Sequence, residues 1–259
     1  MRYSKEGWFL RDSITLFERC IMLAFRSPGA IGLAFIAPAS IMAVFVYVFG
    51  GALDIGDVSV VDYIVPGVVL LTIGQSAAPI SVRFNNDMTK GVIDRFRAMP
   101  IAKSSILIGH VTATVLQNVI SVAATIGVSL LVGFRPQAGL IDWLMAAGIM
   151  LLYIIAIMWL TVFVGLFAKD SEGASSMMTL LGTLPFLSSG FTPTDTMPVA
   201  LRIFAENQPM TPIINSVRAL LLGELLDDRT LQLALFWCVL MIVIFYISAL
   251  LIYKRRTTK

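Results

Sequence analysis

Residues 143–167 read WLMAAGIMLLYIIAIMWLTVFVGLF, an apolar stretch without a single charged side chain. A helix needs about 20 apolar residues to cross the roughly 30 Å hydrocarbon core of a bilayer. Five further stretches have the same character, at residues 31–49, 63–82, 106–132, 174–191 and 231–253. The sequence therefore predicts an all-α membrane protein with six transmembrane helices.

Composition and charge extend this prediction to topology. The chain has 259 residues, is 58% hydrophobic and has a mean hydropathy of +0.87, so six spans leave no room for a sizeable soluble domain. If residues 1–30 are cytoplasmic, only four of the 19 Lys and Arg residues fall outside, namely Arg135, Arg202, Arg218 and Arg229. Basic residues concentrate on the cytoplasmic side of membrane proteins. We therefore expect a multi-pass protein with both termini in the cytoplasm and residues 31–259 forming a single transmembrane domain.

The segment before the first span, residues 1–30, has an amphipathic pattern. Apolar residues recur at helical spacing, and the intervening charged residues take the opposite face. Such a helix lies in the membrane interface, with its apolar side among the acyl chains. Two interpretations stay open, a simple anchor and a helix that contacts a partner.

The residues needed for common energy sources and chemistries are missing. No G-x-x-x-x-G-K-[ST] phosphate loop occurs, and the six apolar cores contain no Asp, Glu, Lys or Arg. One histidine, His110, and two distant cysteines, Cys20 and Cys238, cannot form a metal site. We predict a protein that is not an enzyme, binds no metal, cofactor or nucleic acid, and receives its energy from another polypeptide.

Polar side chains follow one face of two predicted spans. Those on 106–132 are His110, Thr114, Asn118, Ser121, Thr125 and Ser129, and those on 174–191 are Ser175, Thr179 and Thr183. Small polar residues commonly pack membrane helices together. The same pattern also suits a weakly polar pathway for amphiphiles, for which Asn118, Ser121, Thr125, Thr179 and Thr183 are the candidate residues.

Two connections are unusual. The polar loop 83–105 is long enough to contain its own short helix, and loops of this kind often dock a partner. Within 174–230, Ser188-Ser189-Gly190 and the prolines after it forbid one long helix, namely Pro193, Pro198, Pro209 and Pro212. We expect two short half-helices there that dip into the membrane.

Several motifs resemble those of the ABC-2 type permeases, the membrane subunits of ATP-binding-cassette exporters, and in particular the daunorubicin-resistance (DrrB-like) branch. The motifs are YVFGGA at 47–52, DYIVPG at 62–67, GVIDRFRAMPI at 91–101, SSGFTP at 188–193, QPMTP at 208–212 and RALL at 218–221. Their order covers nearly the whole chain.

The resemblance implies a role for each unusual segment. Residues 1–30 correspond to an interfacial elbow helix, and 83–105 to a cytoplasmic coupling helix that contacts a separate ATPase subunit, which binds ATP and Mg. The coupling candidates are Gly91, Asp94, Arg95, Arg97 and Pro100. The region after span five corresponds to an extracellular re-entrant helical hairpin that acts as a gate, with candidates Phe191, Pro193, Pro198, Pro209 and Pro212.

The function implied by the resemblance is ATP-driven export of amphipathic drugs, natural products or lipids. The expected partners are the ATPase, a second permease copy in a homodimer, and membrane lipids, and the expected location is a bacterial inner or plasma membrane. Two alternatives stay open, a permease for polysaccharide or cell-wall glycan on the same scaffold and a non-transporting membrane scaffold.

Overall fold

A computed structural model describes residues 28–50, 58–89 and 103–257, and every regular element in these ranges is helical. The segments predicted as the elbow and coupling helices lie mainly outside them. The long helices are α3 (Val60–Thr89), α5 (Lys103–Val132), α6 (Leu140–Phe167) and α10 (Asp228–Thr257). The shorter elements are α2 (Pro28–Ala43), the π-helical η1 (Val44–Val48), α7 (Ser171–Gly182), η2 (Leu184–Leu187), η3 (Thr194–Thr196), α8 (Val199–Asn207) and α9 (Met210–Leu222).

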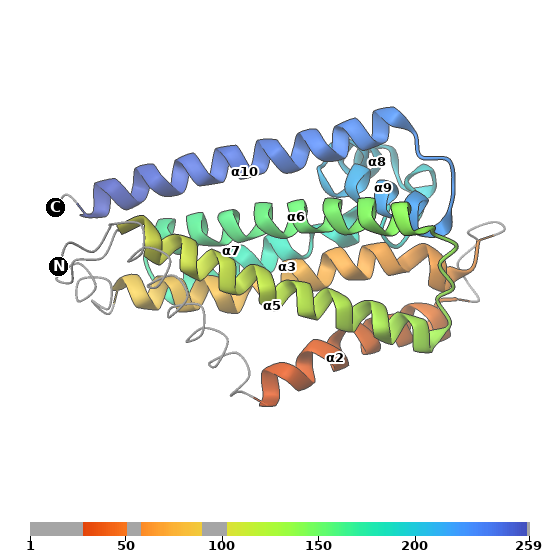
Figure 1. Cartoon of the computed structure of the whole chain (residues 1–259), viewed down its shortest axis with the longest axis horizontal. Coiled ribbons are helices and arrows are strands. Elements are labelled where there is room, and N and C mark those ends of the chain that lie inside the picture. Colours follow the sequence, from red (N-terminus) through yellow and green to blue (C-terminus); the bar gives the residue numbers. More distant parts are fainter. Residues whose placement is uncertain (1–27, 51–57, 90–102, 258–259) are drawn as a thin grey trace, which may run out of the picture.

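Helix α3 forms the centre of the bundle. It packs against α7, α6 and α5 and also touches α2 and α9, while α10 lies outermost against α6 and α9 (Figure 1). Within their most apolar windows, 78% of α3 and of α6 is buried inside the chain, against 22% of α5 and 17% of α10. The apolar outer faces of α5 and α10 are therefore available to lipid.

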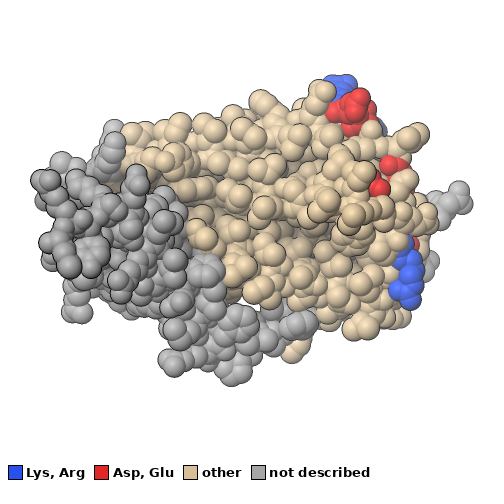
Figure 2. All heavy atoms as spheres, viewed as in Figure 1, with Lys and Arg blue, Asp and Glu red and all other residues tan. Residues whose placement is uncertain are grey.

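The two ends of the bundle differ. Helices α8 and α9 lie together at one end, which we call the α8–α9 end, and the last residue of α3 lies at the other, which we call the Thr89 end (Figure 1). On the face seen in Figure 2, the charged side chains of the described residues gather at the α8–α9 end, and the middle of the bundle is free of them. A wide apolar belt with charged side chains beyond its edge is typical of a chain that crosses a bilayer.

Four helical segments are long and apolar enough to span a membrane by length and composition. They are Val60–Asn86, Thr114–Val132, Leu140–Phe167 and Asp228–Tyr253, and they coincide with predicted spans two, three, four and six. The predicted span at 31–49 corresponds to α2 and η1, which follow each other without a gap. Helix α3 continues past Arg83, the residue where we had expected span two to end, because its polar last turns remain helical to Thr89.

The prediction of one continuous helix over 174–191 is wrong. Helix α7 ends at Gly182, and a short 3₁₀ turn from Leu184 to Leu187 follows. Pro185 explains the break, since proline has no N–H to donate to the carbonyl of residue 181 and its ring obstructs the preceding turn. Beyond this point the chain turns back and forms α8 and α9, two short helices within the interval where half-helices were expected.

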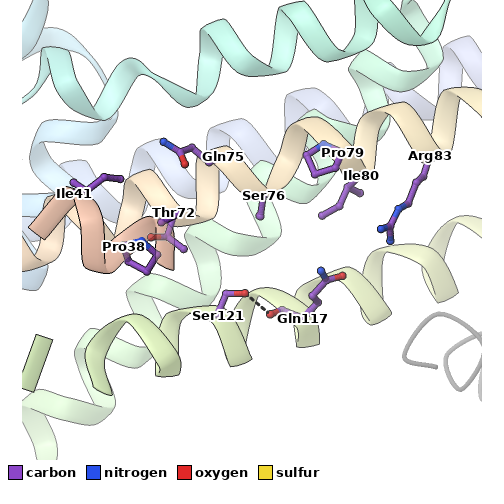
Figure 3. Close-up of a pocket in the computed structure, with 11 residues that line it drawn as sticks. Pro38, Ile41, Thr72, Gln75, Ser76, Pro79, Ile80, Arg83, Gln117 and Ser121 are labelled. Carbon is purple, nitrogen blue, oxygen red and sulfur yellow. Dashed lines mark hydrogen bonds between the residues drawn. The ribbon is translucent and has the colours of Figure 1, made fainter. Parts of the chain in front are cut away.

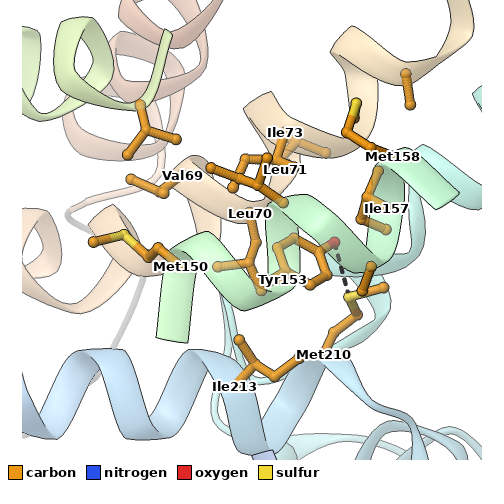
Figure 4. Close-up of a cluster of buried hydrophobic side chains, with 14 of the residues drawn as sticks. Val69, Leu70, Leu71, Ile73, Met150, Tyr153, Ile157, Met158, Met210 and Ile213 are labelled. Carbon is orange, nitrogen blue, oxygen red and sulfur yellow. Dashed lines mark hydrogen bonds between the residues drawn. The ribbon is translucent and has the colours of Figure 1, made fainter. Parts of the chain in front are cut away.

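The core joins α3, α6 and α9. Tyr153 of α6 is 1% exposed, and its hydroxyl donates to Sδ of Met210 at 3.1 Å (Figure 4). Leu70 of α3 and Ile213 of α9 lie beside this pair. Burying a phenol requires a hydrogen-bond partner, and the soft thioether supplies one without adding a charge.

Candidate functional site

A cavity of about 360 Å³ lies between α2, α3 and α5 (Figure 3). Its lining combines apolar and polar residues, namely Ala37, Pro38, Ile41, Thr72, Gln75, Ser76, Pro79, Ile80, Arg83, Gln117 and Ser121. A pocket of roughly 300–1,000 Å³ with an apolar wall and a few polar groups is typical of small-molecule sites. This arrangement suits a molecule that has both an apolar and a polar part.

Helix geometry explains how α3 contributes to this cavity. Its six lining residues fall at positions 72, 75, 76, 79, 80 and 83, the three- and four-residue steps that keep side chains on one helical face. Pro79 sits in this face and cannot donate a backbone hydrogen bond, so the carbonyl of Gln75 lacks its usual helical partner. The face of α3 toward the cavity is therefore more polar than a regular apolar span.

Part of the predicted polar stripe on α5 holds helices together. Asn118 is fully buried, and its Oδ1 accepts a hydrogen bond from the Ser76 hydroxyl at 2.6 Å. Its amide nitrogen donates to the carbonyl of Thr114 at 3.0 Å and contacts Sδ of Met158 at 3.7 Å. Asn118 thus lies where α3, α5 and α6 meet and bonds to the cavity residue Ser76, but it does not itself line the cavity.

The other predicted pathway residues differ in their surroundings. Ser121 lines the cavity, and its hydroxyl donates to the carbonyl of Gln117 (Figure 3). Thr125 is fully buried one turn further along α5. Thr179 of α7 and Thr183, the residue after this helix, are exposed and do not line this cavity. The structure therefore brings Asn118 and Ser121 to α3 but does not bring the two polar stripes together.

A second cavity of about 370 Å³ lies on the other side of α3. It is lined by parts of α3, α6, α7 and α10 and by the start of α9, and the side chains include Phe163, Met177, Met241 and Phe245. None of its lining residues has a hydroxyl, amide or charged side chain. Of these two cavities, the one between α2, α3 and α5, which we call the amphipathic cavity, offers polar groups to a ligand.

Arg218 organises the α8–α9 end. It is 8% exposed, and its guanidinium lies 3.7 Å from the centre of the Tyr63 ring. It donates to the Tyr63 carbonyl at 3.1 Å, to Oδ1 of Asn215 at 2.8 Å and to the Ser189 carbonyl at 2.6 Å. These three acceptors satisfy much of the planar guanidinium fork. One cation therefore links the start of α3, the segment after η2, and α9.

The predicted gate residues cluster around this end. Phe191 is buried, and its ring lies 4.6 Å from that of Phe45 and 4.9 Å from that of Phe186, measured between centroids. The four prolines mark element boundaries: Pro193 precedes η3, Pro198 caps α8, Pro209 caps α9 and Pro212 lies in the first turn of α9. Proline is well tolerated at these positions, because the first N–H groups of a helix have no helical acceptor.

The coupling candidates Gly91, Asp94, Arg95, Arg97 and Pro100 lie outside the described residues. Conversely, sequence reasoning missed the uncharged polar cavity residues Thr72, Gln75, Ser76 and Gln117. A usable signal was present, because a primary amide inside an apolar span is costly unless it faces protein or a polar cavity. Arg83 was noted only as the end of a span, although its spacing from Gln75 and Pro79 places it on the same face.

The helices and cavity define a polytopic α-helical membrane protein with an internal amphipathic cavity. Comparison with known proteins gives the family: the description ABC-2 type transporter matches residues 12–222, and the chain belongs to this family. The daunorubicin resistance ABC transporter permease protein DrrB1 of Streptomyces coeruleorubidus is 28% identical over 187 residues, which cover 72% of this chain and 66% of that protein.

Two further relatives come from Mycobacterium tuberculosis. The probable doxorubicin resistance ABC transporter permease protein DrrC of strains CDC 1551 and H37Rv is 22% identical over 160 residues, covering 62% of this chain and 58% of the relative. The chain thus matches somewhat less than two thirds of the length of these curated relatives. The daunorubicin-resistance resemblance inferred from the motifs is confirmed at this level.

Proposed function

We propose that this chain is the membrane subunit of an exporter that moves amphipathic drugs, natural products or lipids out of the cell, driven by a separate ATPase. The amphipathic cavity is the observation that most supports this function, because its polar and apolar walls suit such molecules. Membership of the ABC-2 type transporter family and the names of the drug-resistance relatives point to the same activity.

The proposed topology has six spans. Helix α2 and the π-helical η1 together form the first span, and α7 and the 3₁₀ turn η2 together form the fifth span. The four long helices form the other four spans. We place the Thr89 end and both termini in the cytoplasm of a bacterial cell, on the evidence of the basic residues. Residues 1–30 form the elbow helix, 31–259 form one transmembrane domain, and α8 and α9 form an extracellular re-entrant hairpin.

The energy source we propose is an ABC ATPase subunit that binds ATP and Mg. Gly91, Asp94, Arg95, Arg97 and Pro100 form the coupling contact with it, and the chain has no ATPase site of its own. A second copy of the permease completes the transporter as a homodimer in the lipid bilayer. The sequence supports this arrangement by its lack of a phosphate loop and of charged residues within the apolar cores.

In this transporter, Ser121 and Asn118 lie on the substrate pathway near the amphipathic cavity, with Thr125 one turn beyond. Thr179 and Thr183 are exposed and contribute to a pathway only through a facing second copy. Phe191 and the prolines at 193, 198, 209 and 212 belong to the extracellular gate. ATP-driven approach of the two coupling helices would open this gate by a rigid-body motion of the spans.

Two other functions can be weighed against this one. A glycan exporter is expected to line its pathway with aromatic rings, and the lining of the amphipathic cavity contains none among the described residues. A non-transporting scaffold needs no cavity with polar groups. Both functions therefore explain less of the observed structure than export of amphiphiles does.

The decisive experiment is co-purification of the tagged chain with the ABC ATPase encoded beside it, followed by ATPase assays in lipid with a panel of amphiphiles. We expect a stable complex whose ATP hydrolysis is stimulated several-fold by lipophilic drugs or lipids. Stimulation by oligosaccharides alone would favour the glycan exporter. Absence of any ATPase partner would overturn the proposal and favour the scaffold.

A further inference from the structure

The amphipathic cavity has an uncharged end and a charged end along α3. Its apolar part is formed by Pro38 and Ile41 of α2 beside Thr72, and Arg83 stands at the opposite end (Figure 3). Arg83 lies eleven positions after Thr72 in the sequence, which corresponds to about 16 Å of helix at roughly 1.5 Å per residue. The cavity is therefore about as long as one leaflet of the roughly 30 Å hydrocarbon core.

The length of α3 relates Arg83 to the expected thickness of the hydrocarbon core. Arg83 lies 23 positions after Val60, the first residue of α3, or about 34 Å along the axis at roughly 1.5 Å per residue. A helix that enters the hydrocarbon at its first turn would leave it just before this residue. An amphiphile with its head at Arg83 and its tail toward Ile41 would consequently keep the orientation of a lipid in one leaflet.

Among the described residues that line the cavity, Arg83 is the only ionisable one, and its side chain is exposed. No carboxylate or other acceptor among the described residues forms an ion pair or hydrogen bond with its guanidinium. An arginine stays protonated under all ordinary conditions and prefers planar oxyanions such as carboxylate and phosphate. The charge at this end of the cavity thus has no counter-ion within the described part of the protein.

From this geometry we propose that the amphipathic cavity is selective for anionic amphiphiles, with a phosphate or carboxylate head group bound by Arg83 and a single apolar tail lying between α2, α3 and α5. The proposal rests on the exporter function above and names its substrate class. Gln75 and Gln117 provide neutral donors beside the tail for polar substituents. A cationic head group of the same size would meet a guanidinium whose charge no described residue neutralises, and would bind more weakly.

Binding can be measured separately from transport. The full-length chain in nanodiscs of zwitterionic lipid is titrated with dodecyl phosphate, dodecanol and dodecyltrimethylammonium, and the bound fraction is read by native mass spectrometry. We expect dodecyl phosphate to bind at least about tenfold more tightly than dodecyltrimethylammonium, the effect of one charge-assisted contact. Arg83→Gln should abolish this preference, and Arg83→Lys should retain most of it.

Two further variants locate the effect. Arg229→Gln removes one positive charge from an exposed position at the start of α10, outside the cavity, and should leave the preference unchanged. Ser121→Phe fills the cavity and should weaken binding of all three ligands, while Arg83 stays in place. Equal affinities in the wild type, or a preference that survives Arg83→Gln, would overturn the proposal.

The same ligands separate this proposal from the proposed function. If dodecyl phosphate binds selectively and also stimulates the ATPase complex, both hold. Selective binding without stimulation or export would support anionic selectivity with a resident membrane lipid as the ligand, and would contradict the exporter function. Export of amphiphiles without charge preference would support the exporter and reject the role of Arg83.

Discussion

Gly74 of α3 and Gly182 of α7 touch backbone to backbone. A Cβ atom added to Gly74 would lie 3.1 Å from the Cα of Gly182, and one added to Gly182 would lie 2.9 Å from the carbonyl oxygen of Gly74. A second close approach joins the same helix to the segment after η2, where a Cβ on Gly67 would lie 2.5 Å from the carbonyl oxygen of Gly190. Small residues allow such packing in membranes, where no hydrophobic effect drives helices together.

Gly182→Ala should therefore destabilise the bundle, because the new methyl group meets backbone rather than a flexible side chain. We expect a loss of about 1–3 kcal/mol in the free energy of unfolding, the usual cost of overpacking a tight contact. Unfolding in mixed micelles with increasing SDS would measure it. Gly127→Ala on α5 is the control, since nothing lies within 4 Å of its added Cβ. Equal effects of the two substitutions would contradict the packing argument.

Arg218→Leu should destabilise the α8–α9 end strongly. The substitution removes the cation and leaves the carbonyls of Tyr63 and Ser189 without this donor in a buried site. We expect a loss of about 3 kcal/mol in the free energy of unfolding, and Arg218→Lys should recover only part of it. Arg202→Gln, which breaks an exposed ion pair with Glu206, should have no measurable effect on the same titration.

The hydrogen bond between Ser76 and Asn118 should appear as energetic coupling. A double-mutant cycle with Ser76→Ala and Asn118→Ala is expected to give about 0.5–1.5 kcal/mol of interaction free energy, the range of interhelical hydrogen bonds in membranes. Ser129, three turns further along α5, bonds instead to Thr125 and Met42. The pair Ser76→Ala and Ser129→Ala should therefore be additive, and coupling in that control pair would show a global rather than a local effect.

Charge reversal in the proposed coupling segment should uncouple the transporter. Arg95→Glu is expected to reduce export at least about tenfold while ATP hydrolysis by the partner continues, since reversing a charge at a docking surface weakens the contact. Export and hydrolysis are measured together in proteoliposomes. Arg229→Glu at the start of α10 is the control and should behave like the wild type. Normal export with a normal hydrolysis rate in Arg95→Glu would reject the coupling role.

The contribution of the N-terminal cap of α10 to the free energy of unfolding should depend on pH. Asp227 caps this helix, and hydrogen bonds from the Thr230 hydroxyl and backbone N–H lower the pKa of its carboxyl below the ordinary value of 3.8. A carboxyl whose pKa is lower in the folded state stabilises it above the unfolded-state pKa, and this contribution disappears as pH falls through the folded-state pKa. The stability difference between wild type and Asp227→Ala should consequently be present at pH 7 and shrink below pH 3.8.

A matched variant tests whether this response belongs to the cap. Asn at the cap accepts the same hydrogen bonds but does not titrate in this range. The stability difference between Asp227→Asn and Asp227→Ala should therefore stay constant as the pH is lowered. A difference that falls in parallel with the wild type would assign the response to other groups.

The long spans could be predicted from sequence because each is a continuous apolar run, and helix formation inside a bilayer depends on little else. The end of α7 could have been anticipated, since Pro185 stands within the stretch that was taken as one span. The amphipathic cavity could not be predicted from the sequence. Its position depends on which face of α3 turns toward α2 and α5, and the close glycine contacts that fix this rotation join residues more than 100 positions apart.

The polar stripes illustrate the same limit. Equal spacing on a helical face placed Asn118 and Ser121 together, yet Asn118 bonds to Ser76 while Ser121 lines the cavity. The stripe on α7 has the same periodicity, but its Thr179 and Thr183 are exposed. Periodicity identifies a face of a helix, and only the packing of neighbouring helices decides what that face meets.

Helix α3 separates two cavities, the amphipathic cavity on one side and the second cavity, which is lined by apolar side chains, on the other. A sideways movement of this helix enlarges one cavity only by shrinking the other, because the same wall bounds both. The contact of Gly74 with Gly182 limits how far α3 can move toward α7. The backbone contact between Gly74 and Gly182 therefore sets an upper limit on how far the amphipathic cavity can widen through movement of α3.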